Sequence, residues 1–71
     1  MKCYRAYFNG LEYYADISKG TLNDDNEYSL FVYARDWRGL RQPDYHHVYK
    51  SERGAQNALK RRYPGVEWNE I

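Results

Sequence analysis

The dipeptide Asn9-Gly10 constrains the fold of this chain more than any other feature of its sequence. Both central residues of a two-residue type I′ turn need a positive φ, which Asn and Gly adopt readily, and this turn matches the twist of the strands that it joins. A two-residue loop also sets the pairing register of the hairpin. We therefore expect Phe8 to pair with Leu11, Ala6 with Tyr13, Tyr4 with Ala15, and Lys2 with Ile17.

The expected pairing divides the hairpin into two faces of different composition. The four pairs named above share one face, which is nearly all apolar. A register shifted by one residue would mix the two faces, so their separation supports the register itself. The opposite face is mixed aromatic and charged, and it pairs Tyr7 with Glu12, Arg5 with Tyr14, and Cys3 with Asp16.

Two further strands are expected after the hairpin. Residues 19–26 are rich in turn formers and lead to a strand over residues 27–35. Residues 36–44 are expected to form a connecting loop, and residues 45–50 a short fourth strand. On the third strand, the side expected to face the core consists of Tyr28, Leu30, Val32 and Ala34.

One helix is expected in the last third of the chain. Ser51 can cap it, and Glu52 follows in the first turn, where the helix dipole favours negative charge. Pro64-Gly65 is expected to end the helix, and an extended segment should then pack Trp68 back on the domain. The apolar residues that recur with helical spacing are Ala55, Ala58, Leu59 and Tyr63.

The order of these elements predicts an α+β fold: an antiparallel sheet of three to four strands, β-β-β-β-α in sequence, with one helix packed across one face. The last extended segment could add a short C-terminal strand. At 71 residues there is room for one core, so residues 1–71 are expected to form a single domain. The other sheet face would then meet solvent.

The composition favours a cytoplasmic protein without a membrane-bound part. Cys3 is the only cysteine, so no internal disulfide can form, whereas secreted chains of this size usually carry several. The sequence shows no signal peptide and no apolar run of about 20 residues, the length that spans a bilayer. The net charge of +1 argues against a broadly basic nucleic-acid binder, although residues 35–71 carry more basic than acidic side chains.

The solvent face of the expected sheet is the first candidate binding surface. Tyrosine has a high strand propensity and pairs well across strands, so one interpretation of this face is purely structural. A second interpretation is a protein-binding or dimer surface, because Tyr and Arg are common in such surfaces. A third is an RNA-binding face on whose rings bases stack. The residues that it collects are Arg5, Tyr7, Tyr14, Phe31, Tyr33 and Arg35.

The segment that follows the third strand is the second candidate. Trp37 is followed by Arg38, and Arg35 and Arg41 lie on either side of them. Arg and Trp are typical anchors of protein recognition, and loops often carry function. The alternative is a solvated loop whose Trp37 folds onto the sheet edge.

No pattern of catalytic, cofactor-binding or metal-ligating residues is found, so neither an enzyme nor a cofactor is expected. His46 and His47 would point to opposite faces of a strand and could not readily chelate one metal. Cys3 has no identifiable base partner, and no glycine-rich phosphate loop or nucleophile motif occurs. The basic residues 60–62 are expected to complement the helix dipole, with phosphate contact as the alternative.

The segment from Tyr49 to Leu59 resembles the strand-to-helix junction of several small β-β-β-α domains, among them the arm-type DNA-binding domains of phage integrases. The resemblance consists of a helix cap and two helix alanines, so it assigns no family. We expect a non-catalytic binding module of the adaptor or inhibitor type, which contacts an unidentified protein partner or a second copy of itself. The alternative is a nucleic-acid-binding module that uses the aromatic and arginine face and the basic loop.

Overall fold

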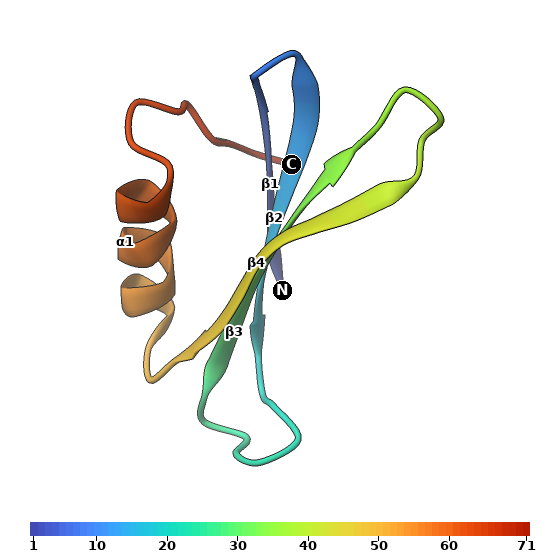
Figure 1. The fold of residues 1–71 in the computed structure, drawn as a ribbon. Coiled ribbons are helices and arrows are strands. Elements are labelled where there is room, and N and C mark those ends of the chain that lie inside the picture. The colour runs from blue at the N-terminus through green and yellow to red at the C-terminus, as the bar shows by residue number, and fades with distance from the viewer.

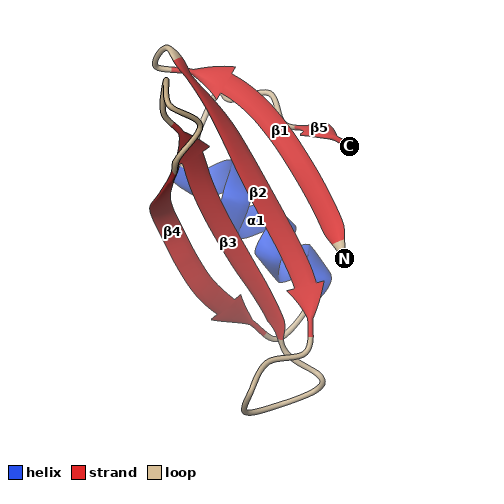
Figure 2. Cartoon of the chain, turned by 90° about the vertical axis from the view of Figure 1, so that its right-hand side faces the viewer, coloured by secondary structure: helices blue, strands red, loops and turns tan.

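A computed structural model describes residues 1–71 as one antiparallel sheet with one helix on one side (Figure 1). The elements are β1 (Lys2–Phe8), β2 (Leu11–Lys19), β3 (Tyr28–Arg35), β4 (Arg41–Tyr49), α1 (Glu52–Arg62) and β5 (Asn69–Glu70). The strand order across the sheet is β4-β3-β2-β1-β5. Figure 2 shows α1 behind the sheet and no element in front of it. The predicted α+β fold is confirmed.

The turn at Asn9-Gly10 joins β1 and β2 as predicted. Asn9 has a φ of 54° and Gly10 a φ of 73°, the positive values that a type I′ turn needs. Every predicted pair is present, from Lys2–Ile17 to Phe8–Leu11. The apolar face of the hairpin is buried against the helix side, as shown by the low exposure of Ala6, Tyr13, Ala15 and Ile17.

The hydrophobic core lies between the sheet and α1. The ring of Phe8 stacks on Tyr13 with 3.9 Å between centroids, and Trp68 packs edge-on against Phe8 at 6.1 Å. Trp68 therefore folds back on the domain as predicted. The core consists of Tyr13, Ala15, Ile17, Leu30, Val32, Ala34, Ala55, Ala58, Leu59 and Tyr63, which includes the whole predicted helical stripe.

The ends of α1 follow the local sequence. The Ser51 hydroxyl accepts a hydrogen bond from the Gly54 backbone N–H at 3.0 Å and so caps the first turn. The ammonium of Lys2 lies 2.7 Å from the Glu52 carboxylate and ties β1 to this end of the helix. The helix ends before Pro64-Gly65, where Gly65 adopts a φ of 78°.

The strand β4 is longer than predicted. The loop predicted over residues 36–44 ends at residue 40, because β4 begins at Arg41. Pro43 is compatible with this strand since β4 lies at the sheet edge, where one side of a strand needs no N–H donor. The register shifts after Val32, so that Asp44 becomes the extra residue of a bulge. Propensity indicated a loop here, and the edge position overrides it.

The β2–β3 loop and the C-terminal strand differ little from the prediction. β2 and β3 pair as far as Lys19 and Tyr28, so the loop between them covers residues 20–27. At the other edge β5 pairs with β1, and the Ile71 N–H donates to the Cys3 carbonyl at 2.9 Å. The expected C-terminal strand is thus present, and it places the C-terminal segment alongside the first half of β1.

Candidate functional site

The sheet face opposite α1, which we call the open face, carries all the residues predicted for it. Figure 2 looks onto this face. Cross-strand pairing determines which side chains are neighbours on it. Three rows of paired residues cross it: Arg5–Tyr14–Tyr33, Tyr7–Glu12–Arg35–Arg41 and Cys3–Asp16–Phe31–His46.

Aromatic side chains from three strands contact one another on the open face and form what we call the aromatic row: Tyr14, Tyr33, Phe31 and His46. Tyr14 and Tyr33 stack with 5.4 Å between centroids and 17° between ring planes. Phe31 lies 5.7 Å from Tyr33 and 5.8 Å from His46. His46 was not predicted as part of this surface, although the alternation of the fourth strand would have placed it on the same face.

Two arginines lie over rings of this row. The guanidinium of Arg41 lies 4.7 Å from the centroid of Tyr33, and that of Arg35 lies 5.4 Å from the centroid of Tyr14. Tyr33 is consequently only 7% exposed, although it lies on the open face. The expectation that Tyr33 is solvent-exposed is wrong, because Tyr14, Phe31 and Arg41 cover it. Its ring has no free face to offer a ligand.

Two acidic side chains, Glu12 and Asp36, lie near the β1–β2 turn, and both accept hydrogen bonds from other groups of the chain. Glu12 accepts a hydrogen bond from the Tyr7 hydroxyl at 2.6 Å, and this contact raises the pKa of Tyr7. Asp36 accepts from the backbone N–H groups of Arg38 at 2.9 Å and Leu40 at 3.0 Å. Although burial opposes the shift, these hydrogen bonds lower the pKa of Asp36.

The arginines of the open face form no ion pair with an acidic side chain. The ion pairs of the molecule are Lys2–Glu52 and Arg38–Asp36. Arg5, Arg35 and Arg41 therefore have no carboxylate partner within the chain. The open face presents unpaired positive charge to whatever approaches it.

The tips of the two hairpins form a groove of about 470 Å³ at one end of the open face, which we call the tip groove. Its lining includes Tyr7, Leu11, Arg35 and Trp37. Trp37 is 91% exposed and Tyr7 is 70% exposed. The alternative in which Trp37 folds onto the sheet edge is wrong: its ring points into solvent and contacts the Arg38 guanidinium at 5.5 Å.

The remaining sequence candidates lie apart from the tip groove. His46 lies on the open face and His47 on the other, and no cluster of metal-ligating side chains is formed. Hydrogen bonding to Asp16, and to a lesser extent burial, raises the pKa of the Cys3 thiol, which leaves it a poor nucleophile at neutral pH. Of the basic helix end, Arg62 packs over Tyr45 at 5.3 Å.

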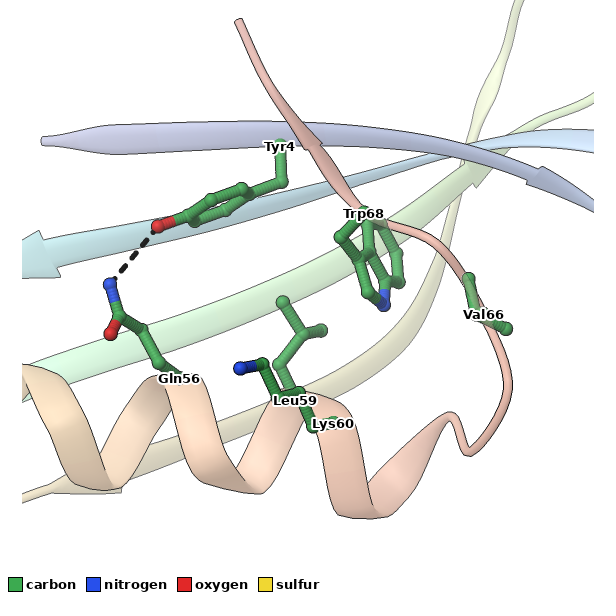
Figure 3. Close-up of a pocket in the computed structure, with 6 residues that line it drawn as sticks. All are labelled: Tyr4, Gln56, Leu59, Lys60, Val66 and Trp68. Carbon is green, nitrogen blue, oxygen red and sulfur yellow. Dashed lines mark hydrogen bonds between the residues drawn. The ribbon is translucent and has the colours of Figure 1, made fainter.

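A second cavity, which sequence reasoning missed, lies between β1, α1 and the C-terminal segment (Figure 3). Its volume is about 300 Å³. The Gln56 amide donates a hydrogen bond to the Tyr4 hydroxyl at 3.1 Å across one end of it. The residues that line it are Tyr4, Gln56, Leu59, Lys60, Val66 and Trp68. No local signal marks this set, because three separate segments contribute to it.

Comparisons with known proteins add no assignment. No protein-family model, no curated protein and no solved structure matches this chain. Its one helix, α1, is neither long nor apolar enough to cross a membrane. The side chains themselves are therefore the basis for a functional proposal.

Proposed function

We propose that this protein is a small non-catalytic binding module that recognises another protein through the tip groove and the adjoining open face. The observation that carries the proposal is the exposure of Trp37, 91%, at the rim of a groove that also exposes Tyr7. Exposed apolar side chains that gather at one place are typical of interaction sites. Trp, Tyr and Arg are the residues that most often act as anchors in protein interfaces.

The burial of Tyr33 within the aromatic row favours a protein partner over a nucleic acid. Single-stranded nucleic acids bind through bases that stack on free ring faces. Tyr33 is covered by Tyr14 and Arg41, so it offers no such face. The net charge of +1 also gives little long-range attraction to a polyanion.

A nucleic-acid-binding module is the second candidate, and one observation favours it. Arg5, Arg35 and Arg41 lie on the open face without carboxylate partners. Arginine side chains on an open sheet can contact phosphates, which supply most of the affinity in such complexes. Phe31 is half-buried and would be the ring left for stacking, since Tyr14 stacks on Tyr33 and lies under the Arg35 guanidinium.

We propose no catalytic role and no cofactor, because the sequence contains no nucleophile motif and no glycine-rich phosphate loop. We place the protein in the cytoplasm, because its single cysteine fits a reducing compartment.

The test compares Trp37→Ala with Leu22→Ala, which removes a fully exposed apolar side chain from a different loop. Proteins crosslinked to the tagged chain in nuclease-treated lysate are identified, and the binding of each purified candidate is then measured by titration. A partner that uses the tip groove should lose about 30-fold or more in affinity with Trp37→Ala, the loss typical of an interface anchor. Leu22→Ala should leave the affinity unchanged. Equal affinity of the two variants would refute the proposed site.

A parallel experiment tests the second candidate. Fluorescence anisotropy with labelled single-stranded RNA and DNA at low salt should show no binding at high micromolar protein. Submicromolar binding would favour the nucleic-acid module, provided that Arg35→Gln weakens it. In that case the logarithm of the affinity should fall with the logarithm of salt concentration by about 0.7 for each phosphate contacted.

A further inference from the structure

The cavity in Figure 3 exists because α1 does not cover the whole sheet. The helix packs on β2, β3 and β4, whereas the same side of β1 is covered by the segment that follows the helix. A seam remains between the helix and this segment. Its apolar walls are the side chains of Leu59, Val66 and Trp68.

The polar groups around this cavity are mostly hydrogen-bond donors. The Tyr4 hydroxyl accepts from the Gln56 amide, so its own O–H remains free to donate. Lys60 takes part in neither of the ion pairs of the molecule, so its ammonium has no carboxylate partner. Figure 3 shows the Lys60 side chain directed toward Gln56, at the Tyr4 end of the cavity.

The indole N–H of Trp68 completes this set of donors. It is the one buried side-chain polar atom of the molecule that has no hydrogen-bond partner. Buried donors are nearly always paired in folded proteins, so an unpaired donor beside a cavity indicates a missing acceptor. In Figure 3 the indole nitrogen lies on the side of the ring that is turned toward the helix.

We propose that this cavity binds a small amphipathic carboxylate. The apolar part of the ligand would pack against Leu59, Val66 and the Trp68 ring, and its carboxylate would accept from the Tyr4 hydroxyl and the Lys60 ammonium. The volume of about 300 Å³ lies at the lower end of the range for ligand sites, so the ligand is about one ring with a short chain. This site is separate from the tip groove and does not depend on the proposed function.

Heteronuclear NMR of the isotope-labelled protein tests the proposal, because the two tryptophans give separate indole N–H signals. Trp37→Phe assigns them. Phenylpropionate should shift the Trp68 signal in a saturable manner, with a Kd of about 1 mM or tighter, a value ordinary for so small a ligand. The Trp37 signal should not move. Phenylpropionamide should bind at least about fivefold more weakly, and phenylpropylamine more weakly still, because each lacks the negative charge.

Two substitutions on the same helix separate the proposed contact from a general effect of charge. Lys60→Gln should weaken phenylpropionate binding about five- to tenfold, since it removes the charged donor. Arg61→Gln removes the same charge one residue further on and lines a different groove, so it should leave the affinity unchanged. Tyr4→Phe should also weaken binding while it keeps the ring. The amide signals of each variant report whether it is folded.

Four results would overturn the proposal. One is the absence of any shift of the Trp68 signal up to about 10 mM phenylpropionate, well above the expected Kd. The others are equal binding of the amine and the carboxylate, equal effects of Lys60→Gln and Arg61→Gln, and parallel shifts of both indole signals.

Discussion

The guanidinium of Arg41 lies 4.7 Å from the centroid of the Tyr33 ring, at the edge of the sheet and on its open face. The contact joins β4 to β3 beside the bulge at Asp44. It covers a tyrosine that the alternation of the strand would otherwise leave in solvent. Arg41 thereby substitutes for a second layer of structure over this part of the sheet.

Replacement of Arg41 should measure what this cover contributes. Arg41→Ala is expected to lower the free energy of unfolding by about 0.5–1 kcal/mol, the range for an exposed cation–π contact. Arg41→Lys keeps the charge but loses the planar stack, so its effect should be smaller. Urea denaturation provides the measurement, and Arg5→Ala is the control because Arg5 lies over no ring. Equal losses for Arg41→Ala and Arg5→Ala would contradict this account.

The substitution Leu59→Ala should remove much of the stability of the fold. Leu59 is buried between α1 and the sheet, and truncation at such a site costs about 2–5 kcal/mol. A small domain is expected to have a total stability of about 5 kcal/mol. Thermal unfolding followed by circular dichroism should therefore show extensive unfolding near body temperature. Leu22→Ala is the matched control, since Leu22 is fully exposed, and its melting temperature should stay within about a degree of the wild type.

Two tyrosines, the half-buried Tyr49 and the buried Tyr63, should make the fold sensitive to alkali. Burial, and then the hydrogen bond with Tyr45, raises the pKa of Tyr49 to about 12. Burial, and then the hydrogen bond to Asp44, raises the pKa of Tyr63 as well. In the unfolded chain both phenols titrate near pH 10. Because the folded state holds these protons more tightly, their contribution is complete below about pH 10 and is lost as the pH rises toward and beyond about 12.

The stability should therefore fall by up to about 1.4 kcal/mol per pH unit for each of these tyrosines above about pH 10. Urea denaturation between about pH 8 and 12 measures this slope, in the range where the phenols titrate. Tyr63→Phe should make the slope shallower, and the double variant with Tyr49→Phe shallower still. An unchanged slope in the double variant would show that other groups control alkaline unfolding.

Replacement by alanine should destabilise the protein strongly at Trp68 and hardly at all at Trp37. Trp68→Ala removes a ring that packs on Phe8 and Tyr63, and it is expected to cost about 3 kcal/mol or more. Trp37→Ala should change the melting temperature by no more than about two degrees, because the ring is 91% exposed. In the wild type, acrylamide should quench mainly the fluorescence of Trp37. Strong destabilisation by Trp37→Ala would show that the loop packs on the sheet.

Local sequence was sufficient for much of this fold. Asn9-Gly10 predicted the turn, the register of β1 and β2, and both faces of the hairpin. Ser51 and Pro64-Gly65 predicted where α1 begins and ends. These features depend on the φ preferences and hydrogen bonds of residues that are neighbours in the chain, so a short stretch of sequence contains the relevant information.

The tertiary structure decided what depends on residues far apart in the chain. Pro43 reads as a loop residue, and only the position of β4 at the sheet edge makes it compatible with a strand. Tyr33 alternates onto the open face as predicted, but contacts from β2 and β4 bury it. The cavity beside Trp68 arises where α1 leaves β1 uncovered. Burial and cavity shape are set by packing between separate elements. The periodicity of side chains within one strand or helix does not specify either of them.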